Sequence, residues 1–164
     1  MPNYAALKAA LATGGAYAGM TDAQAVTACN AVNVPIAVDV ATENVTKYLG
    51  VNGLLPTVVG WAKTAPTPPA AGLTAPETQA AITAAQTFGL MLGPPPQWPS
   101  MQMSDPTTAA QITGMVQAIV TGGLMPQANA TAILAMGTQT VTQASLWGFP
   151  NGITENDVLA ARKL

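Results

Sequence analysis

The chain has 164 residues and only 12 charged side chains, five Lys or Arg and seven Asp or Glu, with a net charge of −2. This 7% share is well below the roughly 25% of an ordinary domain. The basic residues are scattered, apart from one pair at Arg162-Lys163, so the sequence excludes the cationic surface that nucleic-acid binding requires.

Helices and one short extended segment are predicted for residues 1–63. The motif Thr21-Asp22-Ala23-Gln24 is a capping box, in which the Thr hydroxyl and the Gln side chain satisfy free backbone N–H groups at a helix start. Alternating β-branched residues predict an extended segment over 34–40, after which Thr42 is placed to cap a helix. The predicted helices span residues 3–12, 22–32, 42–49 and 55–63.

Three prolines and a glycine between residues 64 and 73 predict a linker. We therefore divide the chain into an N-terminal helical half over 1–63, the linker over 64–73, and a C-terminal helical half over 74–164. We expect the extended segment over 34–40 to pair with a second one over 138–142, which would tie the halves together.

The C-terminal half also has legible helix starts. Thr74 and Glu77 form a second capping box with Pro in the first turn, and Asp105-Pro106 is a further start. The predicted helices span residues 75–92, 106–121, 126–136, 143–147 and 155–163. The fold class is therefore mainly α, a small multi-helix bundle with two short extended segments and Pro- or Gly-rich connectors. Prolines interrupt every long apolar stretch, so we expect no membrane span.

Few residues are suited to catalysis or to metal binding. The chain has no His and one Cys, Cys29, which excludes imidazole catalysis and an intramolecular disulfide. Asp39 and Glu43 are the nearest approach to the carboxylate pair of a glycosidase. The alternative is that Glu43 is a first-turn acid beside a helix dipole. The helix-end position favours this second interpretation, so we expect no catalytic residue, no metal and no cofactor.

Two features of the C-terminal half suggest protein contacts. The run from Pro94 to Pro99 favours polyproline II, either as a stiff connector whose Trp98 packs on its own fold or as an arm on a neighbouring subunit. The many methionines are suited either to filling the core or to an adaptable interface. The candidate interface residues are Trp98, Met101, Met103, Gln111, Met115, Met125 and Thr131.

The charge deficit is concentrated in the same half. From Thr64 to Thr154 only Glu77 and Asp105 are ionised. Mixed surface charges keep freely diffusing proteins apart, and this half lacks them. The pattern indicates a subunit docked in a large assembly, present as a homo-oligomer or in several copies.

The two ends of the chain resemble small proteins encoded among the structural genes of tailed bacteriophages. The opening combines Tyr4-Ala5-Ala6-Leu7-Lys8 with Tyr17-Ala18-Gly19-Met20-Thr21-Asp22, and the helix that follows ends in Cys29-Asn30-Ala31, where the family has Leu-Asn-Ala. The run from Ile153 to Arg162 is similar to the family's closing Val-Thr-x-Asn-Asp-Val-x-x-Ala-Arg. Family members usually carry more charge in the middle. The shared motifs are caps and helix-packing residues, and they transfer no catalytic residue.

The resemblance implies a virion-associated or morphogenetic phage protein, made in the host cytoplasm. The expected function is that of a non-enzymatic structural subunit of a virion, associated with the tail, connector or fibre and bound to other phage structural proteins. The alternatives are a capsid decoration or minor head protein, and an assembly helper that is absent from the mature virion.

Overall fold

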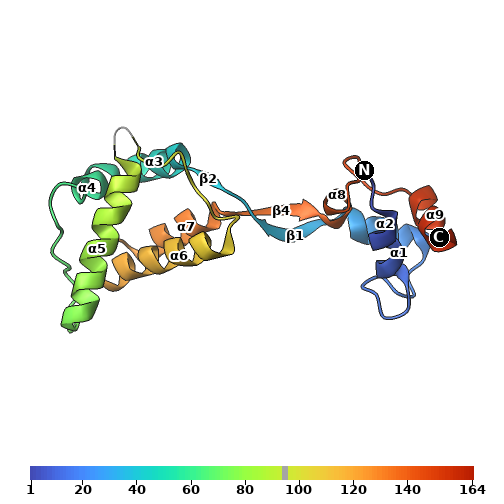
Figure 1. Ribbon diagram of the computed structural model, residues 1–164, viewed down its shortest axis with the longest axis horizontal. Coiled ribbons are helices and arrows are strands. Elements are labelled where there is room, and N and C mark those ends of the chain that lie inside the picture. The colour runs from blue at the N-terminus through green and yellow to red at the C-terminus, as the bar shows by residue number, and fades with distance from the viewer. Residues whose placement is uncertain (94–95) are drawn as a thin grey trace. The chain divides into compact units, whose positions relative to one another are not determined.

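A computed structural model describes residues 1–93 and 96–164, and it confirms the mainly α fold class (Figure 1). Within this described part, contacts divide the chain into two compact units. Unit 1 combines residues Met1–Ile36 with Gln139–Leu164, and unit 2 is the continuous segment Ala37–Thr138. Residues 64–73, expected to be a linker between halves, connect two helices inside unit 2. The bounds of the compact units therefore differ from those of the expected halves.

Unit 1 is built from helices at both ends of the chain. Helices α1 and α9 pack together, and α2 packs on both α8 and α9. Its core includes Leu7, Cys29, Phe149 and Val158, all buried. The expected capping box at Thr21 is confirmed, with a further one at Thr154. The helices of unit 1 are α1 (Tyr4–Leu11), α2 (Asp22–Asn30), α8 (Gln143–Leu146) and α9 (Glu155–Lys163).

The residues that carry the resemblance contact one another within unit 1. Tyr4 donates a hydrogen bond to Asp157, and the Arg162 Nε atom lies 2.9 Å from Asp22 Oδ1. The amide of Asn30 makes two bonds with the backbone of Ile153, one donated and one accepted, each of 2.8 Å. The opening and closing motifs thus have one structural role, which is to join the two ends of the chain.

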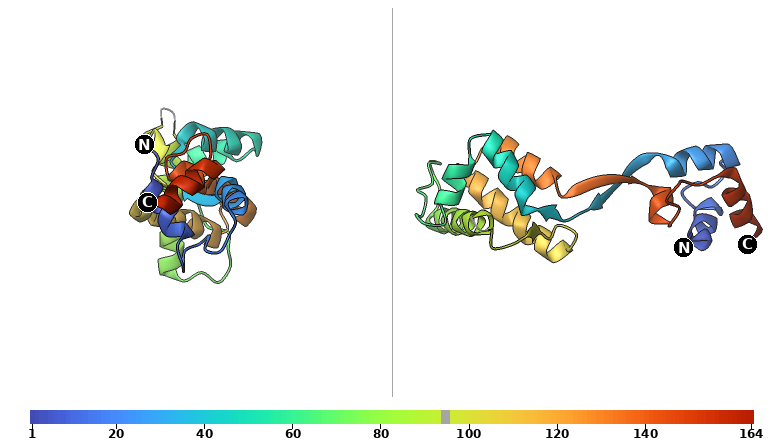
Figure 2. Two further views of the ribbon diagram at one scale, coloured as in Figure 1. Left: turned by 90° about the vertical axis from the view of Figure 1, so that its right-hand side faces the viewer. Right: turned by 90° about the horizontal axis from the view of Figure 1, so that it is seen from above.

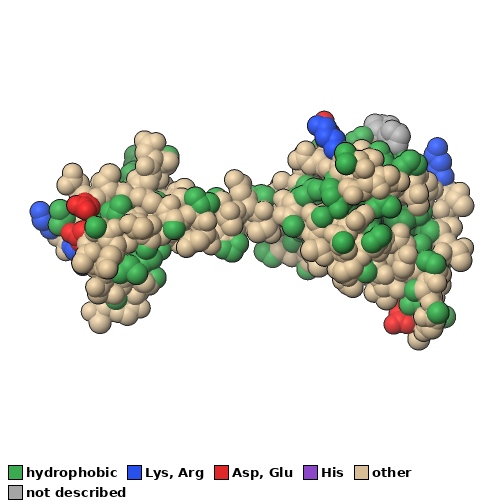
Figure 3. All heavy atoms as spheres, turned by 180° about the vertical axis from the view of Figure 1, so that it is seen from behind, with side chains coloured by type: hydrophobic (Ala, Val, Ile, Leu, Met, Phe, Trp, Pro, Cys, Tyr) green, Lys and Arg blue, Asp and Glu red, His purple; other side chains and the backbone are tan. Residues whose placement is uncertain are grey.

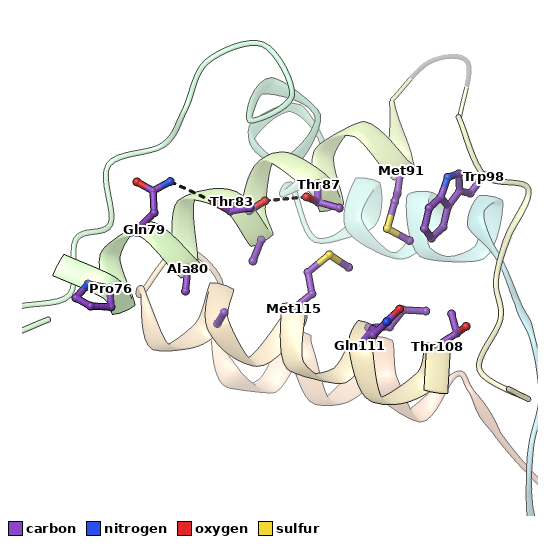
Figure 4. Close-up of a pocket in the computed structure, with 13 residues that line it drawn as sticks. Pro76, Gln79, Ala80, Thr83, Thr87, Met91, Trp98, Thr108, Gln111 and Met115 are labelled. Carbon is purple, nitrogen blue, oxygen red and sulfur yellow. Dashed lines mark hydrogen bonds between the residues drawn. The ribbon is translucent and has the colours of Figure 1, made fainter. Parts of the chain in front are cut away.

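Unit 2 is a helical cluster in which α5 and α6 form the largest contact. Its core contains Phe88, Val116, Ile119 and Ile133, all fully buried. The two long helices match their predicted bounds and run antiparallel (Figure 1, Figure 4). The helices of unit 2 are α3 (Thr42–Val51), α4 (Leu55–Gly60), α5 (Ala75–Leu92), α6 (Pro106–Thr121) and α7 (Gln127–Ala135).

The expected pairing of two extended segments is confirmed, with shifted bounds. Strand β1 (Val32–Ala37) pairs with β4 (Thr138–Thr142), and the two run side by side in Figure 2. The predicted segment over 34–40 is not a single strand, because β1 ends at Ala37 and Val40 is part of another strand. Val40 begins β2 (Val40–Ala41), which pairs antiparallel with β3 (Ser100–Met101) inside unit 2.

The helix predicted over 22–32 ends at Asn30, because β1 begins at Val32, and the helix predicted over 42–49 continues to Val51. The predicted cap of α3 and the predicted end of α4 are also wrong, each for a local reason. Thr42 does not cap α3, because its hydroxyl donates to the carbonyl of Trp98 over 2.6 Å. Helix α4 ends at Gly60 rather than at residue 63, because the following N–H groups bond three residues back, as Lys63 N does to Gly60 O. In the described ranges, no helix combines the length and the hydropathy that a membrane crossing needs.

Candidate functional site

Unit 2 contains a groove of about 680 Å³ between α5 and α6, here called the α5–α6 groove (Figure 4). Its volume is within the range of typical binding sites. One wall is a stripe along α5 and the other a stripe along α6, with Trp98 at one end. The lining residues are Pro76, Gln79, Ala80, Thr83, Ala84, Thr87, Met91, Trp98, Thr108, Gln111, Ile112, Met115 and Ala118.

Helical spacing produces both walls. Residues three or four apart share one face of an α-helix, and the lining positions of α5 and α6 follow this spacing. The inner faces of these helices are used by the core, where Phe88 and Val116 are fully buried. The groove is therefore lined mainly by their second faces, on which Thr83, Thr87 and Gln111 are exposed.

No charged side chain lines the groove among the described residues. The two carboxylates of this region cap the helices instead. Glu77 accepts from the Thr74 N–H over 2.8 Å, and Asp105 accepts from the Thr108 N–H over 2.7 Å. Hydrogen bonds, from the Thr74 hydroxyl to Glu77 and from Thr108 to Asp105, lower the pKa of each carboxyl. Both carboxylates are therefore held at the N-termini of α5 and α6, and the groove walls are neutral.

The polar groups of the α5 wall are hydroxyls and amides. Gln79 Nε2 donates to Thr83 Oγ1 over 3.2 Å, and the Thr87 hydroxyl donates to the Thr83 carbonyl over 2.9 Å. These bonds within the helix leave mostly methyl and methylene groups facing the groove (Figure 4). A surface of this kind loses little hydration when a partner covers it.

Trp98 is held by its backbone, while its ring remains accessible. Its carbonyl accepts from the hydroxyl of Thr42, which is only 1% exposed, and the Thr42 N–H donates to the Pro99 carbonyl over 3.0 Å. Trp98 is 46% exposed, and its indole lies beside Met91 at the end of the groove (Figure 4). Of the expected Pro94–Pro99 arm, Pro94 and Pro95 lie outside the described residues.

The structure brings together three of the seven candidate interface residues. Trp98, Gln111 and Met115 line the groove, whereas Thr131 is exposed on α7 and does not line it. The other three are buried in the core of unit 2, where they fill space: Met101, Met103 and Met125. Sequence reasoning missed Thr83 and Thr87, although their spacing on α5 was visible.

Asp39 and Glu43 do not share a partner or an environment. Asp39 accepts from the Ser104 N–H over 3.0 Å and from its hydroxyl, and these bonds lower its pKa. Glu43 lies 2.8 Å from Lys47 Nζ, which lowers the Glu43 pKa in turn. The general acid of a glycosidase needs a raised pKa. Neither carboxyl has this property.

Charged side chains are also sparse on the face of the molecule that Figure 3 shows. Residues 1–93 and 96–164 contain no cluster of three His, Cys, Asp or Glu side chains able to hold a metal ion. No protein-family model, curated protein or solved structure matches the chain. The candidate site therefore rests on the geometry and chemistry of the α5–α6 groove.

Proposed function

We propose that this chain is a non-enzymatic structural subunit of a bacteriophage virion, present in several copies, which acts by protein–protein docking through the α5–α6 groove. One observation carries the proposal: an accessible groove of about 680 Å³ whose lining, among the residues that the structure describes, contains no charged side chain. The occupant that fits it is a helix with an uncharged face. A charge placed against these walls would be desolvated with no opposite charge to pair with it.

Trp98 supports docking at one end of this groove. Tryptophan is enriched among residues that contribute most of the binding energy at protein interfaces. Here the hydrogen bonds of Thr42 already hold the backbone of Trp98 in place. A partner that covers the indole therefore pays little of the ordering entropy that weakens binding by flexible segments.

The resemblance supports the virion as the location. Its motifs lie in unit 1, where they join the two ends of the chain. The charge-poor stretch from Thr64 to Thr154, in which this chain departs from the family pattern, includes the part of unit 2 that forms the groove. A common unit 1 combined with a specialised unit 2 is consistent with a family whose members contact different partners.

A charge placed in the groove tests the proposal in infectious particles. We expect Gln111→Lys to block particle assembly, because Gln111 lines the groove and a buried lysine there has no partner. Gln117→Lys is the matched control, since Gln117 is exposed on the same helix and does not line the groove. Thr131→Glu tests the α7 surface separately. Circular dichroism of each purified variant checks the fold, and normal titres for Gln111→Lys would refute the docking role.

Mass spectrometry of purified virions tests the structural role itself. A subunit of the particle is recovered in a fixed ratio to the other virion proteins. Peptides present in infected cells but absent from purified particles would instead identify an assembly helper. Labelling the protein and imaging intact particles then separates a tail or connector position from a capsid decoration or minor head protein.

A further inference from the structure

We propose that the occupant of the α5–α6 groove is a second copy of this chain, with the two α5 helices packed across a two-fold axis. This inference rests on the docking role proposed above and names the partner. It follows from the length, the charge and the shape of the groove walls.

The length of the groove matches a helix of this chain. The lining of α5 runs from Pro76 to Met91, which at 1.5 Å per residue is about 22 Å, or roughly four helical turns. Among the described helices, only α5 and α6 exceed ten residues. The chain therefore supplies its own candidates for the occupant.

The charge of these helices matches as well. The described residues of the walls include no charged side chain, so an occupant must offer an uncharged face of the same length. Helix α5 carries no charge from Thr78 to its end, and α6 carries none at all. Two copies can thus approach without repulsion and without burying an unpaired ion.

The shape favours α5 as the helix that enters the groove. Its exposed face presents Ala80, Thr83 and Thr87, which are small and allow helix axes to approach closely. The lining of α6 carries the longer Gln111 and Met115 along its middle, which form a wall rather than a ridge, whereas the long side chains of the α5 lining, Gln79 and Met91, lie toward its two ends. In such a contact, α5 of each copy forms a wall of its own groove and also enters the groove of the other copy. The same surface is used on both sides, as a two-fold interface requires.

The resulting assembly is a bundle of four helices, with α5 and α6 from each copy. The middle of the α5 lining falls at Thr83, which places Thr83 close to the two-fold axis. In an antiparallel pairing of the two α5 helices, Trp98 of one copy meets the start of α5 in the other. The indole that is exposed in one copy is then covered.

Sedimentation equilibrium of the full chain tests this arrangement. We expect a concentration-dependent dimer, and we expect Thr83→Lys to raise the dissociation constant by roughly a hundredfold, because two lysines meet near the axis. Thr113→Lys is the control, since Thr113 is an exposed threonine of α6 outside the groove lining. A wild-type chain that stays monomeric, or equal dissociation constants for Thr83→Lys and the wild type, would overturn the proposal.

Disulfide formation tests independently whether Thr83 lies close to the two-fold axis. Under oxidising conditions Thr83→Cys should form covalent dimers, whereas Thr113→Cys and the wild type, whose Cys29 is buried, should not. Equal yields for the two variants would contradict the two-fold contact. A monomeric chain whose Gln111→Lys variant still blocks particle assembly would overturn the second copy as occupant and leave the docking role standing. If the wild-type chain dimerises but its Gln111→Lys variant still forms normal particles, only the docking role in the virion is refuted.

Discussion

At the scale of single residues, most of the few charges of this chain lie at helix ends, and three of the carboxylates, Glu77, Asp105 and Asp157, bond to the backbone there. Asp157 is the most connected of them. It accepts from the Thr154 N–H over 2.9 Å, from the Thr154 hydroxyl over 2.6 Å and from the Tyr4 hydroxyl. The same carboxylate thus caps α9 and ties α1 to it, so its ionisation is linked to the stability of unit 1.

This linkage predicts an acid-sensitive stability. Hydrogen bonds from Thr154 and Tyr4 lower the pKa of Asp157 below its ordinary value. A lowered pKa in the folded state means that the stabilisation is complete above the ordinary Asp pKa, near 4, and is lost as the pH falls through the folded value. We therefore expect Asp157→Asn to be less stable than the wild type at neutral pH, with the difference shrinking as the pH falls below about 4.

Urea unfolding at a series of pH values measures this effect. The variant Tyr4→Phe removes one of the donors to Asp157 and should reduce the acid dependence only in part. Unfolding midpoints of the wild type and Asp157→Asn that stay parallel throughout the acid range would contradict the linkage.

At the scale of elements, the helices of unit 2 come close where glycine replaces a side chain. A Cβ atom built on Gly89 of α5 would lie 2.6 Å from the Val58 carbonyl oxygen and 2.8 Å from the Ala62 nitrogen. Both are backbone atoms and cannot rotate away. Gly89 therefore sets the distance between α5 and α4, two helices that pack together in unit 2.

Two glycine-to-alanine substitutions should have opposite signs. We expect Gly89→Ala to destabilise the protein by about 1–3 kcal/mol, because the methyl group forces α4 and α5 apart. Gly114→Ala should stabilise it by about 0.5–1 kcal/mol, since alanine is the better helix former and a Cβ there meets nothing within 4 Å. Urea unfolding measures both, and the same sign for the two variants would contradict the packing of α4 on α5.

At the scale of the whole molecule, each unit has a core of its own. The buried cluster of unit 2 extends from Val40 to Ile133, whereas that of unit 1 takes its residues from both ends of the chain. Unit 2 is thus continuous in sequence, and unit 1 requires two segments that are more than 100 residues apart.

This organisation predicts an asymmetry between fragments. We expect residues 37–138, expressed alone, to fold with helical circular dichroism and a cooperative thermal transition, because the fragment keeps its core intact. Residues 1–36 alone should stay unfolded, since the partners of α1 and α2 are α8 and α9. A fragment 37–138 that melts without cooperativity would contradict the independence of unit 2.

The sequence by itself determined the features that depend on near neighbours. The capping boxes at Thr21 and Thr74 were predictable because their partners lie three residues away. The bounds of α5 and α6 followed from Pro in the first turn at the start and Gly at the end. The charge deficit after Thr64 was also visible without any structure.

Only the tertiary structure decided which side chains are accessible. Thr42 was expected to cap a helix, but its hydroxyl bonds to Trp98, 56 residues away. Met101 and Met115 look alike in sequence, yet one is buried beside β2 and the other lines the groove. The physical reason is that burial depends on which elements pack together, and residues far apart in sequence make those contacts. The groove exists because α5 packs on α6. That contact depends on many side chains along both helices, so no short motif in the sequence predicts it.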